Sequence, residues 1–305
     1  ARLHSERAEW AQVEALVRPI AEAGFRELAV FYLLGEALRQ LGRRAEARAV
    51  FEAGLEGHPR NAELEARLGC VLLDADEPVK AIELLGRARR ARPRDAQVLT
   101  YFAGALLRVG RVEEAEAQLA RALLVGGGAD TRLVLAMVKL RRGQFDDADR
   151  IAAQVEAADG AAVPLVWAAR ALRADVKLLR GEARGAFEAW QRIDAAGHLQ
   201  VHHLAHMAYA GELAGEGAQV DSAIARRLAD QPQAEDLLVF ASIANLRKEP
   251  ARALDWLDQA QRQVKVSNSG WEFDFHSARG RALRLLERRD EARQALDTAC
   301  ALPEA

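Results

Sequence analysis

Apolar residues recur along most of the chain at intervals of three and four, the spacing that places side chains on one face of an α-helix. Between residues 28 and 129 this pattern repeats every 34 residues without insertion, in the blocks 28–61, 62–95 and 96–129. We call the equivalent positions of the blocks columns. The repeated pattern predicts an all-helical chain built from one small structural unit.

Each block has the pattern of two helices joined by a turn. The first helix carries apolar residues with a small residue among them, as in Leu34, Gly35 and Leu38. A small residue in that column allows the second helix to approach closely, and glycine at the turn accepts the positive φ that ends a helix. The turn column holds Gly42, Asp76 and Gly110. Such a hairpin buries its apolar face only against neighbouring hairpins, which predicts a solenoid.

These columns resemble the tetratricopeptide repeat family, which also has a period of 34 residues. The first block carries the family's residue types at Phe31, Leu34, Gly35, Leu38, Ala47, Phe51 and Pro59. The resemblance implies a right-handed α-solenoid of stacked antiparallel helix pairs, with about seven to eight repeats.

We expect four segments on this basis. Residues 1–27 form a capping helix or half repeat, 28–129 form three well-matched repeats, and 130–200 form degenerate repeats. Residues 201–305 form further repeats of the same type, with a loop near 264–270.

The composition supports helices and argues against other classes. Of 305 residues, 50% are hydrophobic but only 6% are aromatic, whereas a β-sheet needs β-branched and aromatic side chains. A formal net charge of -2 gives no bulk field for nucleic acid or an anionic membrane, and no apolar run approaches a membrane span of ~20 residues. We interpret the arginine-rich string 87–92 as cations that complement the end of a helix. We therefore expect neither nucleic-acid binding nor membrane insertion.

The residues that could carry chemistry do not form a site in the sequence. His198, His202 and His206 would share one face if their helix begins early enough, but no cysteine lies nearby, so we expect no metal site. Cys70 and Cys300 lie in distant blocks, and we interpret both as small buried hydrophobes. Because no nucleophile with a base and no phosphate-binding loop is found, we expect no enzyme activity and no cofactor.

The family resemblance implies that the first helix of each pair lines a concave groove. The candidate groove residues are Tyr32, Glu36, Arg39, Leu73, Leu107, Arg108, Met137, Leu140, Arg141 and Tyr209. Relatives that hold the C-terminal carboxylate of chaperones use Lys, Asn and Arg at five groove positions. Here those positions hold Tyr32, Glu36, Arg67, Gln97 and Tyr101, so we expect no chaperone-tail binding.

A line of leucines in one groove column suggests the kind of partner. Its members are Leu73, Leu107, Leu140 and Leu178. With arginines beside them, they suit an acidic, amphipathic protein segment. The alternative is that these leucines are buried between successive repeats.

The sequence thus predicts a protein-binding scaffold that holds a peptide or helical segment of a partner. The alternative is a regulatory or scaffolding region of a larger bacterial protein with a catalytic, transcriptional or envelope-assembly role. A cytoplasmic location is favoured, or a periplasmic or lipid-anchored one if an N-terminal signal was removed before Ala1. The aromatic cluster of Trp271, Phe273 and Phe275 also suggests a homo-oligomer formed through the C-terminal repeats.

Overall fold

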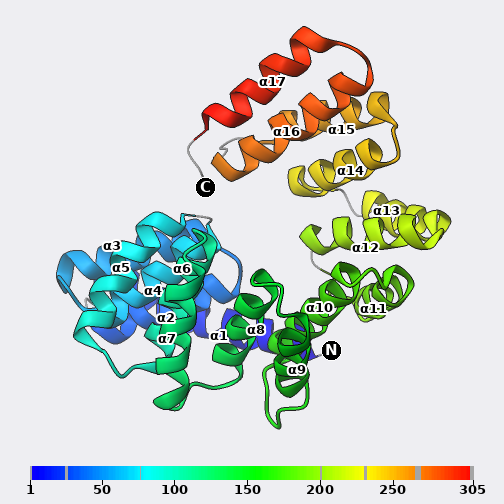
Figure 1. Cartoon of the computed structure of the whole chain (residues 1–305). Helices are drawn as coiled ribbons and strands as arrows, with labels where there is room; N and C mark the ends of the chain where they lie inside the picture. The colour runs from blue at the N-terminus through cyan, green and yellow to red at the C-terminus, as the bar shows by residue number, and fades with distance from the viewer. Residues whose placement is uncertain are drawn as a thin grey trace. The chain divides into compact units, whose positions relative to one another are not determined.

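The computed structural model describes residues 2–24, 27–75, 77–199, 201–229, 232–264 and 269–302. These residues form 17 α-helices (Figure 1). Their bounds are α1 Arg2–Glu22, α2 Leu28–Gln40, α3 Arg44–Gly57, α4 Ala62–Asp74, α5 Pro78–Ala91, α6 Ala96–Arg108, α7 Val112–Leu124, α8 Ala129–Arg141, α9 Phe145–Glu156, α10 Val163–Leu179, α11 Ala183–Ala195, α12 Val201–Ala214, α13 Gly217–Ala229, α14 Ala234–Leu246, α15 Pro250–Gln263, α16 Ser269–Leu285 and α17 Arg289–Ala301.

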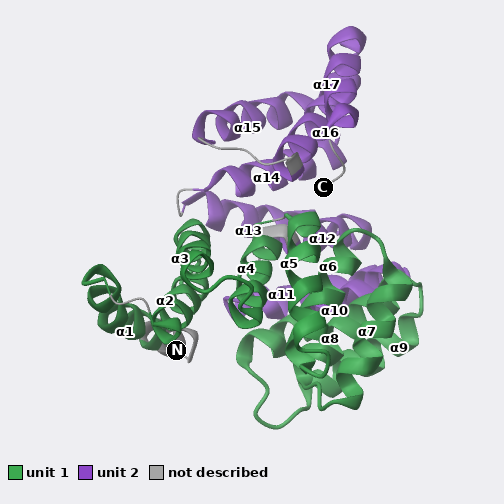
Figure 2. Ribbon diagram, turned by 90° about the vertical axis from the view of Figure 1, so that its left-hand side faces the viewer, with its two compact units in different colours: residues 1–169 green, residues 170–305 purple. Residues whose placement is uncertain are grey.

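Within the described residues, α1 is followed by eight successive helix pairs, from α2 and α3 to α16 and α17. The two helices pack on each other in the pairs α2–α3, α4–α5, α6–α7, α8–α9, α12–α13, α14–α15 and α16–α17, and first helices of neighbouring pairs also pack together, such as α4 with α6 and α12 with α14. The predicted all-helical array of about seven to eight repeats is thereby confirmed. The chain divides into two compact units, residues 1–169 and 170–305, which we describe separately (Figure 2).

The small residue of the first helix lets the second helix of the pair approach, as predicted. A Cβ atom added to Gly35 would lie 2.5 Å from two ring atoms of Phe51, and one added to Gly69 would lie 2.6 Å from Cγ of Leu85. Phe51 and Leu85 occupy the same column of their repeats and are fully buried. Glycine at this column therefore makes room for a fully buried apolar side chain of the second helix.

The turn between paired helices requires a left-handed backbone. Gly42 and Gly110 have φ values of 79° and 75°, which glycine adopts without steric cost. The last two pairs place Lys248 and Glu287 at the equivalent position, with φ values of 59° and 61°. Asp76, the predicted turn residue of the second block, lies outside the described residues.

Each unit has its own buried core. In residues 1–169 the core contains Leu38, Phe51 and Leu64, and in residues 170–305 the fully buried side chains include Trp190 and Phe240. No described helix combines the length and apolar character needed to cross a membrane. The predicted loop near 264–270 lies between α15 and α16, and its residues 265–268 lie outside the described part of the chain.

Two sequence interpretations change with the structure. Cys70 is buried as expected, but Cys300 is exposed, because the buried side of α17 is formed by Ala292, Ala295 and Ala299 instead. His198 precedes α12, which begins at Val201, so the three histidines do not lie on one helix. The side chain of His202 lies outside the described ones, and His206 instead contacts Asp175.

Candidate partner-binding site

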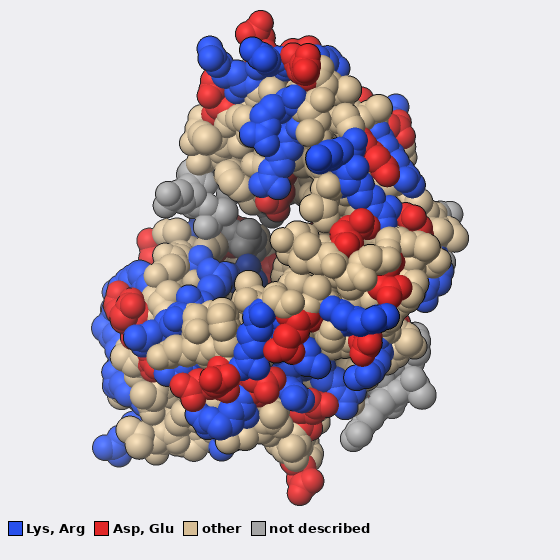
Figure 3. Space-filling model, turned by 45° about the vertical axis from the view of Figure 1, so that its right-hand side comes forward, with Lys and Arg blue, Asp and Glu red and all other residues tan. Residues whose placement is uncertain are grey.

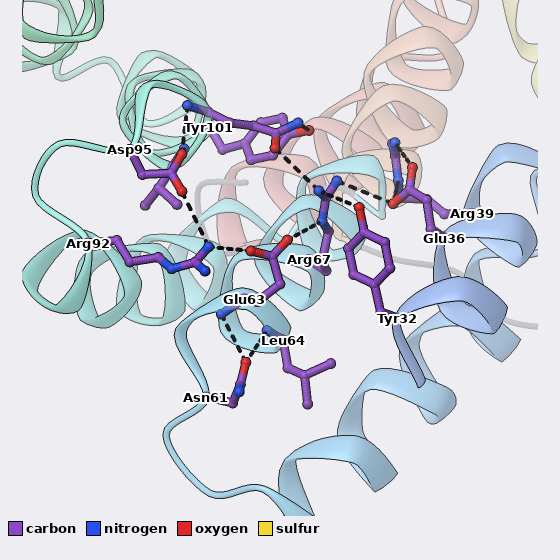
Figure 4. Close-up of polar contacts among 12 residues, drawn as sticks. Tyr32, Glu36, Arg39, Asn61, Glu63, Leu64, Arg67, Arg92, Asp95 and Tyr101 are labelled. Atoms are coloured by element: carbon purple, nitrogen blue, oxygen red, sulfur yellow. Dashed lines mark hydrogen bonds and ion pairs between the residues drawn. The ribbon is translucent and has the colours of Figure 1, made fainter. Parts of the chain in front are cut away.

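Two N-cap side chains fix where the first helices of the second and third pairs begin. The Asn61 side chain accepts hydrogen bonds of 3.1 Å from the backbone N–H groups of Glu63 and Leu64 at the start of α4 (Figure 4). Asp95 likewise accepts bonds from the first turn of α6, including one of 3.0 Å from Gln97. These caps satisfy helix-end donors and hold Glu63 and Gln97 at defined positions.

Arg67 of α4 connects the first helices of three consecutive pairs. Its Nη2 donates to the Tyr32 hydroxyl at 3.0 Å and to Oε1 of Gln97 at 3.2 Å, and its Nε donates to Oε1 of Glu63 at 3.1 Å. Its guanidinium carbon also lies 4.9 Å from the centroid of the Tyr32 ring. Tyr32 belongs to α2 and Gln97 to α6, so one side chain ties three helices together (Figure 4).

Glu36 carries the negative charge at the centre of this network. It accepts a 2.7 Å hydrogen bond from Nη2 of Arg39 and another of 2.7 Å from Gln40, and it lies 3.5 Å from Nη1 of Arg67. Burial opposes its ionised form, but the hydrogen bonds and nearby guanidinium charges outweigh burial and lower the pKa of Glu36. Glu36 is therefore a buried carboxylate that stays ionised at neutral pH.

Further acidic and neutral groups complete the network. Arg39 also donates to Asp74 at 3.3 Å, and Arg92 donates to Glu63. Burial raises the pKa of the Tyr101 hydroxyl and of the Cys70 thiol well above their usual values, so both groups are neutral at neutral pH. Most charges of this face are thus paired, and the face is a fixed polar surface rather than a basic one. Basic and acidic side chains are also interspersed over the face drawn in Figure 3.

The predicted line of leucines is not an open groove floor. Leu107 is only 4% exposed and packs in the core with Leu106 and Val138. Its assignment to the groove surface is therefore wrong, and for this residue the alternative of burial between repeats holds. Leu73 and Leu140 are half-buried, and Leu73 packs against the core of its unit.

The other candidate residues fall into two groups. Tyr32, Glu36 and Arg39 belong to the polar network described above. Exposed side chains form the second group: Arg108 and Arg141 at the ends of α6 and α8, Met137 on α8 and, in the other unit, Tyr209 on α12. Met137 is 43% exposed and Tyr209 is 45% exposed, values that leave both side chains available for contact.

The aromatic cluster predicted for self-association is largely internal. Phe275 is only 3% exposed, and its ring stacks on that of Trp271 at 5.0 Å between centroids. Phe273, at 48% exposure, is the member that faces outward.

Sequence reasoning overlooked a row of leucines in the unit 170–305. Each lies two residues before a turn residue with positive φ, at the last position of α10, α14 and α16 and at the next-to-last position of α12. We call Leu179, Leu213, Leu246 and Leu285 the leucine row; their exposed fractions are 58%, 57%, 43% and 41%. The last positions of the first helices in the other unit are polar: Gln40, Asp74, Arg108 and Arg141. The same column is therefore polar in residues 1–169 and apolar in residues 170–305. Aligning the later repeats with the first three would have revealed this difference in the sequence.

Side-chain contacts hold the helices of the leucine row together. They join His206 Nδ1 to Asp175 Oδ1 at 2.8 Å, Arg247 Nε to Glu212 Oε1 at 2.7 Å, and Asn245 Nδ2 to the carbonyl oxygen of Ala278 at 2.9 Å. The hydrogen bond with Asp175 raises the pKa of His206. Such a contact connects α10 with α12, the residue that directly follows α14 with α12, and α14 with α16. The exposed leucines thus lie on helices that are held together by side-chain contacts.

Comparison with known proteins places these features in a family. Two models described as tetratricopeptide repeat match residues 28–69 and 72–129. A tetratricopeptide repeat protein from Parabacteroides merdae is 12% identical, with 90% of this chain and 98% of that chain covered and a TM-score of 0.56. The human IFIT1 dimer with PPP-AAAA is 16% identical over 99% of this chain and 79% of that one, with a TM-score of 0.67.

A third structure, the Cut9–Hcn1 hetero-tetramer of APC/C, is 16% identical, with 96% of this chain and 53% of that chain covered and a TM-score of 0.62. No curated protein sequence matches significantly. At these identities the likeness concerns the fold alone. Together with the repeat columns and the helix pairs, the family models show that the chain is a tetratricopeptide repeat protein.

Proposed function

We propose that this protein is a non-catalytic scaffold that binds segments of partner proteins on the faces formed by its first helices. Proteins of this family mediate protein interactions, and the leucine row is the observation that carries the proposal here. Four large apolar side chains remain exposed at equivalent positions of four consecutive pairs. Exposed apolar side chains that recur on neighbouring helices are typical of interaction sites in proteins.

The energetics favour a partner that covers the row. Complete burial of a fully exposed leucine side chain contributes about 1.5–3 kcal/mol, and the row leucines are 41–58% exposed, so each contributes about half of that and the four together offset part of the entropy lost on association. Basic side chains lie one or two positions from row leucines, at Arg180, Lys248 and Arg284. An amphipathic segment with acidic residues beside its apolar ones therefore complements this surface.

The unit 1–169 offers a different chemistry on its first helices. Tyr32, Glu36 and Arg39 are held in a polar network, which presents hydrogen-bonding groups in a fixed arrangement. Met137 and Arg141 are exposed on α8. We assign this face to binding a polar segment of a partner, with one apolar side chain of that segment in contact with Met137. Because the polar groups are already held in place, they lose little entropy when the partner binds.

The leucine row is tested by comparing two surface substitutions in the full chain. Leu213→Ser with Leu246→Ser removes two row members, whereas Leu124→Ser removes a leucine that is 87% exposed on the second helix α7. Proteins from the source organism are captured on each immobilised variant and identified by mass spectrometry. The proposal expects partners to be lost from the row variant and retained by the Leu124 variant. If both variants captured the same partners in equal amounts, the leucine row would not be part of the binding surface.

A further inference from the structure

A pocket of about 440 Å³ lies in the unit 1–169, among α5, α6 and the turn before α7. Its apolar part is formed by Ile82 and Gly86 of α5 and Phe102 of α6. A Cβ atom on Gly86 would have Phe102 as its nearest neighbour at 3.8 Å, an ordinary contact distance. Close packing therefore does not require glycine at position 86. The missing side chain leaves open space beside the Phe102 ring.

Four arginines surround this apolar part: Arg87, Arg89, Arg90 and Arg111. Arg87 is paired with Glu65 at 2.6 Å, and Arg111 is paired with Glu114 at 2.6 Å. Arg90 is exposed and has no ion pair with any described residue. Glu83 is the only acidic side chain in the lining, so the guanidinium groups of Arg89 and Arg90 share the pocket with a single carboxylate.

Arg89 gives the pocket an unsatisfied donor. Its guanidinium carbon lies 5.1 Å from the centroid of the Phe102 ring. Its Nε atom is buried and lacks a hydrogen-bond partner among the described residues. Arg89 also makes no ion pair with any described residue, so no carboxylate neutralises its guanidinium, and a ligand carboxylate would do so. The pocket thus combines an apolar wall with a cation that lacks an acceptor.

We propose that this pocket binds an acidic segment of a protein partner, with one large apolar side chain against Ile82 and Phe102 and a neighbouring carboxylate on Arg89 and Arg90. Charge complementarity selects the carboxylate, since the two cations have a single acidic neighbour in the lining. A volume of about 440 Å³ lies within the range of ligand-sized pockets. The site uses residues distinct from both first-helix faces, so it goes beyond the function proposed above.

A peptide fits this pocket better than single-stranded nucleic acid does. Nucleic-acid binding without sequence preference relies on aromatic faces on which bases stack. Phe102 is the one aromatic residue of the lining, and Arg89 already lies over its ring. An aliphatic or aromatic side chain needs only the apolar wall and the ring edge.

The test measures fluorescence polarisation of a labelled peptide, Asp-Asp-Phe-Asp-Asp, with the full chain. Two control peptides replace Phe by Ser or all Asp by Asn, and a single-stranded oligonucleotide serves as a competitor. Arg90→Ala removes an unpaired cation, and Gly86→Leu fills the apolar part. Arg94→Ala removes an exposed cation outside the lining and is the matched control.

We expect the peptide to bind the wild type, and Arg90→Ala and Gly86→Leu to weaken binding by about tenfold, which corresponds to about 1.4 kcal/mol. Arg94→Ala should leave the dissociation constant unchanged, and both control peptides should bind more weakly. The inference is overturned if the labelled peptide does not bind, if Gly86→Leu binds it as tightly as the wild type, or if the oligonucleotide displaces it in preference to unlabelled peptide. None of these outcomes affects the leucine row, which lies in the other unit.

Discussion

Arg67 of α4 contacts Tyr32 of α2 in two ways at once: it donates a 3.0 Å hydrogen bond to the hydroxyl, and its guanidinium carbon lies 4.9 Å from the ring centroid. Arg67 also lies 3.5 Å from Glu36, with both side chains less than 10% exposed. A buried guanidinium with this many partners stabilises the stack of first helices, because removing it would break contacts to Tyr32, Glu36 and Gln97 at once, although Arg39 would still pair with Glu36.

Arg67→Met should therefore destabilise the protein strongly. Arg67→Met removes the hydrogen bonds that the guanidinium donates to Tyr32, Gln97 and Glu63, whereas Tyr32→Phe removes only one of them; a hydrogen bond that involves a charged group contributes about 1.5–3 kcal/mol. Urea denaturation of both variants measures the difference. The double substitution Arg67→Met with Glu36→Gln should recover part of the loss. Equal stability of Arg67→Met and the wild type would contradict the assigned role.

Glu36 should make the stability depend on pH. Its folded-state pKa is lowered, so its contribution is present above the unfolded-state pKa of about 4.3 and is lost as pH falls through the folded-state value. We expect Glu36→Gln to be less stable than the wild type at pH 7, with a difference that shrinks below about pH 4. Denaturation of both proteins over that range provides the test, and a difference that grows on acidification would contradict it.

Gly35→Ala should show whether close approach of paired helices is essential. The new methyl group would lie 2.5 Å from the Phe51 ring, so the ring or the helix must move. Overpacking of this kind costs about 1–3 kcal/mol. Phe51→Leu in the same chain should relieve part of the strain. A measured stability equal to that of the wild type would mean that the pair is loosely packed.

Lys248→Gly should have the opposite effect. Lys248 has a φ of 59°, a left-handed conformation that costs a residue with a side chain about 1–2 kcal/mol. Glycine removes that cost but gains entropy in the unfolded chain, so we expect a net stabilisation of about 0.5 kcal/mol. Glu287→Gly tests the same turn in the next pair, and thermal unfolding measures both. Destabilisation of both variants would contradict the assignment.

Exposed and buried leucines should respond differently to truncation. Leu213→Ser alters a member of the leucine row that is 57% exposed, and we expect a stability change within about 0.5 kcal/mol. Leu107→Ala creates a cavity in the core and should cost about 2–5 kcal/mol. Denaturant titration of the two variants separates the cases. A large loss in Leu213→Ser would show that the row is structural.

The sequence was sufficient to predict the helix pairs, because their columns follow from contacts within one repeat. Gly35 opposite Phe51 is such a contact. Burial between repeats was harder to predict: Leu107 shares a column with half-buried Leu73, and only the packing of the neighbouring helix decides that it is internal. Arg67 and Gln97 appeared only as departures from a known clamp, since side-chain pairing across three helices leaves no periodic signal.

Site-specific photo-crosslinking tests the central claim most directly, namely that first-helix faces bind a protein partner. A benzophenone amino acid is placed at Leu213 in the leucine row, at Met137 on α8 and, as the control, at Leu124 on α7. After irradiation in the source organism, adducts are identified by mass spectrometry. We predict that crosslinkers at Leu213 or Met137 form adducts with defined proteins, and that the crosslinker at Leu124 forms no adduct with the same proteins. Adducts that form equally at all three positions, or only at Leu124, would contradict the claim.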